Sequence, residues 1–143
     1  MNELLNVLIV DDEYPVLVTA AAILSEDFRV LTASDATKAL ALMQKNTIDV
    51  LATDFNMPGR NGIQLLREAT AAQPHLSGLL ITGHAEYLEK RDKYDAQGLY
   101  YLLLKPYQPK QLVDLVHRAA ESSRLKRTLS SISSELKAWK RVM

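Results

Sequence analysis

Residues 4–13 read Leu4-Leu5-Asn6-Val7-Leu8-Ile9-Val10-Asp11-Asp12-Glu13, an apolar run that ends in three acids. Its short length and its lack of alternation between apolar and polar residues favour a strand that is buried on both faces of a parallel sheet. Four more short apolar runs follow along the chain, at residues 29–33, 48–53, 79–82 and 99–104. The sequence therefore predicts five buried parallel strands.

Segments of helical length separate these runs and follow the last of them. The residues that bound them are Pro15, Ser34 or Asp35 as a cap, Gly62 with Pro74, and Pro109. The segment at residues 86–97 is much more polar than the others, and we expect this fourth helix to be the least well anchored. Five strands alternating with five helices predict an α/β fold, a doubly wound parallel sheet with helices on both faces and right-handed crossovers.

The composition narrows the class of protein. A chain of 143 residues fits one domain, and its net charge of zero argues against a globally basic nucleic-acid-binding protein. No stretch approaches the roughly 20 apolar residues that span a bilayer, and the start does not resemble a signal peptide. Without cysteine, disulfides and thiolate metal sites are excluded. We expect a cytoplasmic protein that binds neither membranes nor nucleic acid directly.

The pattern changes after residues 1–122, which we predict to form the globular domain. A C-terminal extension, residues 123–143, carries an apolar seam with the 4-3-4-3-4 spacing of a heptad repeat. Its members are Leu125, Leu129, Ile132, Leu136, Trp139 and Met143. The extension could be a solvated helix, a coiled coil that joins two copies as a homodimer, or a linker to an output domain. A seam that runs to the last residue favours a piece cut from a longer protein.

Charge is also unevenly distributed between these two parts. Six of the 17 basic residues but one of the 17 acidic residues lie in residues 124–141, which leaves 11 basic and 16 acidic residues in the domain. The domain is therefore acidic and the extension basic. The apolar seam makes a protein partner a better interpretation of the basic extension than a nucleic acid.

Acids follow two of the predicted strands. Asp11 and Asp12 come directly after the first strand, and Asp54 ends the third. In a doubly wound sheet the working site lies at the carboxyl ends of the strands, so these carboxylates are expected to converge. Converging carboxylates repel one another unless a cation lies among them, and an oxygen-rich site suits Mg²⁺ or Mn²⁺. The adjacent pair Asp11-Asp12 alone would be a weak signal; Asp54 strengthens it.

Two further strand ends add complementary groups. Thr82 supplies a hydroxyl beside Gly83, which leaves room for a ligand, and Lys105 supplies a mobile cation before Pro106. Carboxylates, a metal, a hydroxyl and an ammonium suit a phosphoryl group whose oxygens need positive partners while a carboxylate attacks. The chain has no Gly-rich phosphate loop, so a nucleotide is not the obvious source of phosphate.

Four stretches in order resemble the signature of the receiver domains of two-component response regulators. They are Leu8-Ile9-Val10-Asp11-Asp12-Glu13, Asp54-Phe55-Asn56-Met57-Pro58-Gly59-Arg60-Asn61-Gly62, Thr82-Gly83 and Lys105-Pro106. The similarity covers roughly residues 5–121. It implies a sheet in strand order 2-1-3-4-5 and a phosphoryl group accepted on an aspartate from a sensor histidine kinase or a phosphotransfer protein.

The resemblance also implies a role for each matching residue. Asp54 would be the phosphoacceptor. Asp12 and Asp54 would bind the metal directly, Asn56 would add its backbone carbonyl, and Asp11 would act mainly through water. Thr82 would contact the phosphoryl oxygens.

The same resemblance implies that Lys105 contacts the phosphoryl oxygens and that the peptide bond between Lys105 and Pro106 is cis. Many receivers carry an aromatic residue three positions before this lysine, where this chain has Leu102. Either Tyr101 substitutes for that aromatic residue, or the signal travels through the fourth helix. The remaining members of the predicted switch region are Gly83, Pro106 and His84, and we interpret His84 as a residue at the rim of the site.

Two other functions compete with this hypothesis. A phosphohydrolase with an aspartate nucleophile is one, although haloacid-dehalogenase-like enzymes need a second acid where this chain has Asn56. A receiver-shaped interaction module that no longer accepts phosphate is the other, and Leu102 weakly favours it. We expect a signalling protein rather than an enzyme with a free substrate, one that catalyses only its own phosphorylation and slow dephosphorylation.

Overall fold

A five-stranded parallel sheet organises the protein, whose computed structural model describes residues 4–83 and 100–142. The strands are β1 (Asn6–Val10), β2 (Arg29–Ala33), β3 (Val50–Asp54), β4 (Ser77–Thr82) and β5 (Tyr100–Leu104). Their order across the sheet is β2-β1-β3-β4-β5. The fold class and the strand order expected above are therefore confirmed.

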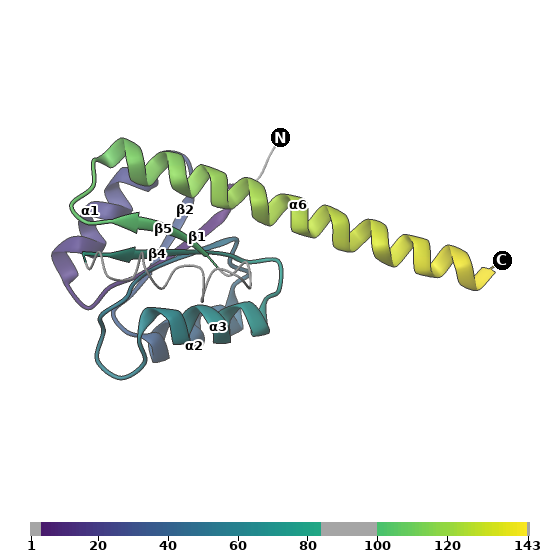
Figure 1. Ribbon diagram of the computed structural model, residues 1–143, viewed down its shortest axis with the longest axis horizontal. Helices are drawn as coiled ribbons and strands as arrows, with labels where there is room; N and C mark the ends of the chain where they lie inside the picture. Colours follow the sequence, from purple (N-terminus) through teal and green to yellow (C-terminus); the bar gives the residue numbers. More distant parts are fainter. Residues whose placement is uncertain (1–3, 84–99, 143) are drawn as a thin grey trace.

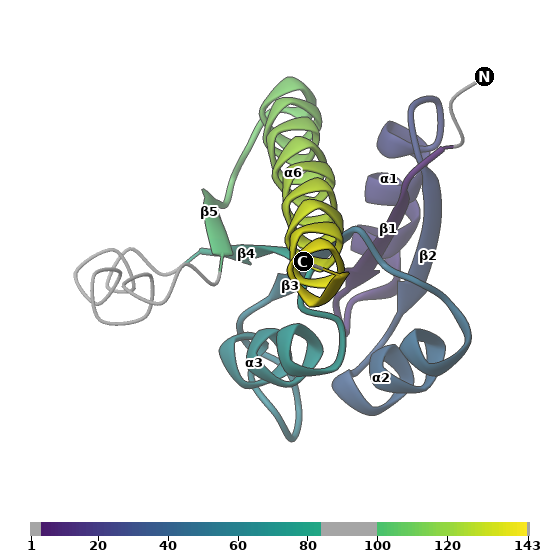
Figure 2. The same cartoon turned by 90° about the vertical axis from the view of Figure 1, so that its right-hand side faces the viewer.

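Helices cover both faces of this sheet. They are α1 (Tyr14–Leu24), α2 (Ala36–Lys45), α3 (Gly62–Ala72) and α6 (Pro109–Val142). Figure 2 shows α1 and α6 on one side of the strands and α2 and α3 on the other. The predicted fourth helix, at residues 86–97, lies outside the described residues.

Alternation along each strand divides the core into two layers. Successive side chains of a strand point to opposite faces. Val7 and Ile9 therefore pack with α1 and α6, whereas Leu8 and Val10 pack with α2 and α3. All four side chains are nearly inaccessible to solvent, which explains why the sequence of β1 reads as a continuous apolar run.

Local signals place the starts of two helices. The Asp35 carboxylate accepts a hydrogen bond from the backbone N–H of Lys38 at 2.8 Å, so of the two expected caps it is Asp35 that caps α2. Asn61 and Gln64 form a reciprocal capping box at the start of α3. This capping box determines where α3 begins after the turn that follows β3.

The bounds of β2 are as predicted, whereas those of the other four strands differ from the predicted runs by one or two residues. β1 begins at Asn6, because its pairing with β2 starts there, and Leu4 is half exposed. β3 includes Asp54, which pairs with Ile81 of β4. Apolar character marks burial rather than hydrogen-bonded pairing, so the runs and the strands need not end at the same residue.

Helix α6 continues well past the sheet as a single helix (Figure 1). Lys126 donates to the backbone carbonyl of Leu76 at 3.1 Å. Arg127 forms an ion pair with Asp49, and its guanidinium donates to Nε2 of His75 at 3.1 Å. From residue 128 to residue 142 every side chain is exposed. No helix among the described residues is long and apolar enough to cross a membrane.

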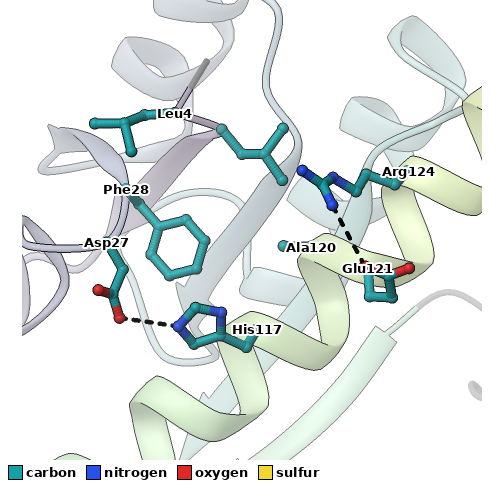
Figure 3. Close-up of a pocket in the computed structure, with 8 residues that line it drawn as sticks. Leu4, Asp27, Phe28, His117, Ala120, Glu121 and Arg124 are labelled. Atoms are coloured by element: carbon teal, nitrogen blue, oxygen red, sulfur yellow. Dashed lines mark hydrogen bonds and ion pairs between the residues drawn. The ribbon is translucent and has the colours of Figure 1, made fainter. Parts of the chain in front are cut away.

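A second contact joins α6 to the connection between α1 and β2. His117 Nε2 lies 2.9 Å from a carboxylate oxygen of Asp27, and its ring lies 4.7 Å from that of Phe28, centroid to centroid. These side chains line a hollow of about 240 Å³ together with Glu121 and Arg124 (Figure 3). The sequence offered no partner for His117; the tertiary structure provides one.

Candidate functional site

The ends of β1 and β3 bring the predicted acids together. Val10 pairs with Thr53 in adjacent parallel strands, so the residues that follow each of them leave the same edge of the sheet. Asp54 is the last residue of β3, and Asp11 and Asp12 begin the turn after β1. We call this edge, where the strands end, the carboxyl edge.

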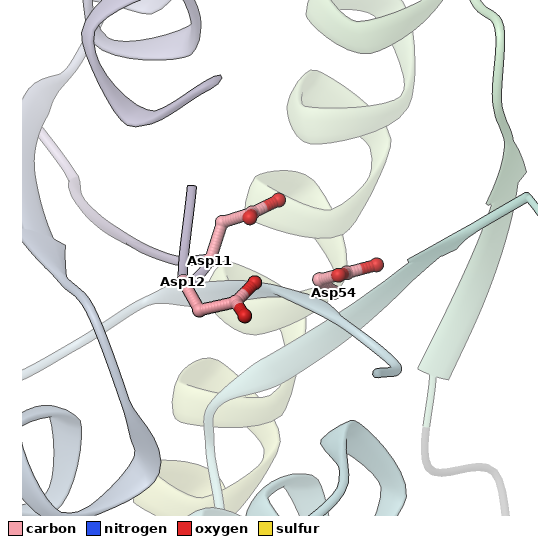
Figure 4. Close-up of side chains that lie close together, drawn as sticks. All are labelled: Asp11, Asp12 and Asp54. Carbon is pink, nitrogen blue, oxygen red and sulfur yellow. The ribbon is translucent and has the colours of Figure 1, made fainter. Parts of the chain in front are cut away.

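The three carboxylates lie close together at the carboxyl edge (Figure 4). One oxygen of each of Asp11, Asp12 and Asp54 lies within 4.8 Å of the others, and within residues 4–83 and 100–142 they form the one such group of potential ligands. Asp11 is buried, Asp54 is partly buried and Asp12 is exposed. Such a set of hard oxygen ligands, open to solvent on one side, fits Mg²⁺, which keeps several waters and takes one or two carboxylates.

Lys105 supplies positive charge to this cluster. Its ammonium lies 3.3 Å from Oδ2 of Asp11 and 3.5 Å from Oδ1 of Asp54. Burial by itself lowers the pKa of Lys105, but Asp11 and Asp54 outweigh it and hold that pKa above 10.5. Lys105 is therefore a fixed cation that contacts two of the three carboxylates.

Asp54 is the carboxylate whose acidity is most clearly perturbed. Burial raises its pKa above the usual 3.8; Lys105 opposes the shift and the nearby charge of Asp11 adds to it. The Lys105 ammonium thus partly offsets the free energy needed to keep the partly buried Asp54 ionised. A carboxylate kept available beside an ammonium is chemically suited to attack an electrophile such as phosphorus.

The turn between β3 and α3 is built tightly around Asp54. The Gly62 N–H donates to the carbonyl of Phe55 at 2.9 Å, which closes the loop. A Cβ atom on Gly62 would lie 2.4 Å from the backbone oxygen of Asp54, so glycine is required there. Asp12 and residues of this loop, Asn56 among them, line an open hollow of about 300 Å³.

The remaining predicted residues lie along the same edge. Thr82 ends β4 and is buried, and its carbonyl accepts from the N–H of Lys105 at 2.8 Å. Gly83 follows it and is exposed, and a Cβ added there would make only an ordinary contact, 3.9 Å from Cβ of Lys105. The bond between Lys105 and Pro106 is cis, as the resemblance implies. His84 lies outside the described residues.

Tyr101 and Leu102 point to opposite faces of the sheet. Tyr101 packs against the layer that contains α1 and α6, whereas Leu102 packs against the layer that contains α2 and α3. Tyr101 therefore does not occupy the face on which Leu102 lies. A role for either side chain in switching stays a prediction.

Two features near the site have no counterpart in the sequence patterns. Oδ1 of Asp11 accepts the N–H of Glu13 at 2.9 Å, which orients that carboxylate. Tyr107 packs against the core layer that contains α1 and α6, and burial raises the pKa of its hydroxyl above 10.0. Its position directly after Lys105-Pro106 places Tyr107 near the site in the sequence. No pattern in the sequence, however, indicated that its side chain would be partly buried.

Comparison with known proteins identifies the same family that the sequence motifs resemble. The model of the response regulator receiver domain matches residues 7–117. A solved receiver domain from Clostridium thermocellum is 32% identical, covers 85% of this chain and 98% of its own, and superposes with a TM-score of 0.77. NtrX from Brucella abortus, solved with ADP, is also 32% identical, with a TM-score of 0.81 over 91% of this chain and 30% of its own.

Curated relatives are longer regulators. The hydrogenase transcriptional regulatory protein HoxA of Cupriavidus necator is 33% identical over 92% of this chain and 27% of its own length. The DNA-binding transcriptional regulator NtrC of Salmonella typhimurium is 31% identical over 78% of this chain and 24% of its own length. The chain thus spans about a quarter of the length of these relatives. It belongs to the response regulator receiver domain family of two-component systems.

Proposed function

We propose that this receiver domain accepts a phosphoryl group on Asp54 from a phosphohistidine of a sensor histidine kinase or a phosphotransfer protein. The observation that carries the proposal is the position of Asp54 at the carboxyl edge, with its Oδ1 3.5 Å from the Lys105 ammonium and its carboxylate beside those of Asp11 and Asp12. The family supports the reaction class, since the relatives are regulators of two-component systems.

The chemistry follows from these side chains. A carboxylate oxygen of Asp54 forms a bond to phosphorus while the phosphorus–nitrogen bond of the donor breaks, and the electron pair returns to the imidazole. The product is an acyl phosphate. Lys105 is placed to neutralise charge that develops on the phosphoryl oxygens, and the Thr82 hydroxyl would donate to another of them. Slow hydrolysis of the acyl phosphate would reset the domain, without any free substrate.

Mg²⁺ or Mn²⁺ is the metal that the ligand set fits. Asp12 and Asp54 would hold it through their side chains, Asn56 through its backbone carbonyl, and Asp11 through water. When bound, the ion supplies positive charge that offsets repulsion between the carboxylates and the incoming phosphoryl group. Asp11 remains oriented by Glu13 and paired with Lys105, which is consistent with an indirect role.

Phosphorylation would act by shifting an equilibrium between two states of the domain. A covalent phosphoryl group changes that balance only if it is bound better in one state. The surface altered would comprise residues 86–97, for which the sequence predicts a helix, together with β5 and α6. An output domain in a longer protein or a separate partner would bind this surface. We place the protein in the cytoplasm, where kinase and receiver would meet.

The direct test is labelling with acetyl phosphate, a small phosphodonor, in the presence of Mg²⁺, followed by intact mass spectrometry. We expect a gain of one phosphoryl group that hydroxylamine removes, as for an acyl phosphate. Asp54→Asn should abolish the gain, while the control Asp114→Asn, an exposed aspartate of α6, should retain it. Full labelling of Asp54→Asn would refute the assignment.

The same experiment separates the competing functions. Multiple turnover of phosphoesters, with release of free phosphate, would indicate a phosphohydrolase. No labelling together with no binding of Mg²⁺ would indicate a receiver-shaped interaction module that has lost the reaction.

A further inference from the structure

The part of α6 that extends beyond the sheet carries a continuous apolar stripe that nothing in the described structure covers. Its side chains are about half exposed or more: Leu125 55%, Leu129 65%, Ile132 47%, Leu136 55% and Trp139 61%. Large apolar side chains aligned in this way mark a surface for association rather than a solvated face.

This stripe faces away from the body of the domain. Val116, Ala120 and Ser123 are three of the five buried positions of α6, the face that packs toward the sheet. Leu125, Leu129 and Ile132 follow them by nine residues each, and nine residues at about 100° per residue turn the helix by half a circle. A partner helix can therefore lie along the stripe while the domain stays on the far side.

The stripe also begins where the domain ends. Upstream positions of the same heptad phase are Ser122 and Arg118, which are polar. At the boundary, Lys126 and Arg127 bond to the start of β4 and to Asp49, so their charges are held by the domain rather than offered to the partner. Pairing would thus start at Leu125 and run toward the C-terminus.

We propose that the stripe binds the same stripe of a second copy of this chain, in a parallel and in-register coiled coil. Leu129 and Leu136 occupy a positions, and Leu125, Ile132 and Trp139 occupy d positions. In a parallel pair, the g residue of one helix lies beside the e residue of the next heptad in its partner. Here that pair is Glu135 with Lys140, formed twice by symmetry.

Charge argues against the antiparallel alternative. An antiparallel arrangement that keeps the whole stripe paired sets Leu129 opposite Trp139. It then brings e positions together and g positions together. Glu135 would then face Glu135 of the other copy, a pair of like charges. Because the one acid of the extension sits where a parallel partner offers a lysine, the parallel dimer is the occupant that the charges favour.

Solution mass tests the association. Sedimentation equilibrium of the full chain, without any phosphodonor, should give twice the 16.0 kDa chain mass. Leu136→Lys should give the mass of one chain, whereas Ser134→Lys, two residues away on the outer face, should remain a dimer. Both residues lie beyond the domain, so its thermal unfolding should be unaffected. A single-chain mass for the unmodified protein up to submillimolar concentration would overturn the proposal.

Orientation is tested by a disulfide, since the chain has no cysteine of its own. Leu129→Cys should oxidise to a covalent dimer, because residue 129 meets residue 129 only in the parallel register; Ser131→Cys, on the outer face, should not. A mixed disulfide between Leu129→Cys and Trp139→Cys chains, without the 129–129 product, would show an antiparallel pair and overturn the proposal.

A charge exchange tests the register. Glu135→Lys should weaken dimerisation by about fivefold, since two opposite-charge pairs become like-charge pairs. Adding Lys140→Glu to that variant should restore it. Equal dimerisation by all three chains would overturn the register. These outcomes are independent of the phosphoacceptor assignment, because none of them involves Asp54 or a phosphodonor.

Discussion

Arg127 of helix α6 forms an ion pair with Asp49, the residue immediately before β3. Asp49 is buried, with 4% of its surface exposed, and its other carboxylate oxygen accepts the N–H of Asn6 at 2.8 Å. Arg127 thus joins α6 to the edge of the sheet where the strands begin. This edge is opposite the carboxyl edge, where the three aspartates lie. The contact anchors α6 at this edge of the sheet.

Removing the arginine should destabilise the protein. Arg127→Ala leaves a buried carboxylate without its cation, and we expect the free energy of unfolding to fall by about 1–2 kcal/mol, less than for a fully buried pair because Arg127 is partly exposed. Arg124→Ala, which removes an exposed arginine 3.8 Å from Glu121, should change it by less than about 0.5 kcal/mol. Urea denaturation measures both. Equal losses would mean that the pair with Asp49 contributes nothing specific.

Gly62 should tolerate no side chain. In Gly62→Ala the new Cβ would meet the backbone oxygen of Asp54 at 2.4 Å and Cδ1 of Leu80 at 2.9 Å. We expect a loss of about 1–3 kcal/mol in the free energy of unfolding, as for overpacking, and slower phosphorylation because Asp54 is displaced.

The matched control for this substitution is Gly83→Ala. There the nearest atom to the new Cβ is Cβ of Lys105, at an ordinary 3.9 Å. The variant should unfold within about 0.5 kcal/mol of the unmodified chain. Indistinguishable unfolding curves for the two alanine variants would show that the turn after β3 relaxes freely.

His75 should make stability depend on pH. Burial, and then the charge of Arg127, lower the pKa of His75 below 6.5; Lys126 adds to this and Asp49 opposes it. The unfolded chain therefore binds a proton more readily than the folded one, so stability is lost as pH falls from about 6.5 toward the lowered pKa.

Substitution isolates the contribution of this histidine. His75→Gln removes the ionisable group at this position. The free energy of unfolding of this variant should therefore fall less steeply below pH 6.5 than that of the unmodified chain. The measurement is the urea midpoint of both chains at a series of pH values between about 5 and 8. Parallel profiles for the two chains would contradict the prediction.

Mg²⁺ should stabilise the folded chain through the clustered aspartates. A ligand that binds the folded state alone raises the free energy of unfolding by about 2.7 kcal/mol at one hundred times its dissociation constant. Asp12→Asn should remove most of this gain, whereas the exposed Asp114→Asn should keep it. Thermal unfolding with Mg²⁺ and with a chelator measures the effect. An undiminished gain in Asp12→Asn would place the ion elsewhere.

The strands, the family motifs and the strand ends that carry Asp11, Asp12 and Asp54 could all be predicted from the sequence. They could be predicted because strands buried on both faces must be apolar along their whole length, which makes them conspicuous in a chain of mixed composition. The heptad spacing from Leu125 onward could also be predicted, because a periodic pattern is a local property of the chain.

Only the tertiary structure determined which distant groups meet. No local pattern indicated that Arg127 pairs with Asp49, that His117 contacts Asp27, or that Tyr107 is partly buried. Such contacts depend on how helices are positioned over the sheet, and single polar side chains leave no periodic signal in the sequence. Apolar periodicity determined the layers and the strand ends; the packing of those layers determined the partners of the individual charges.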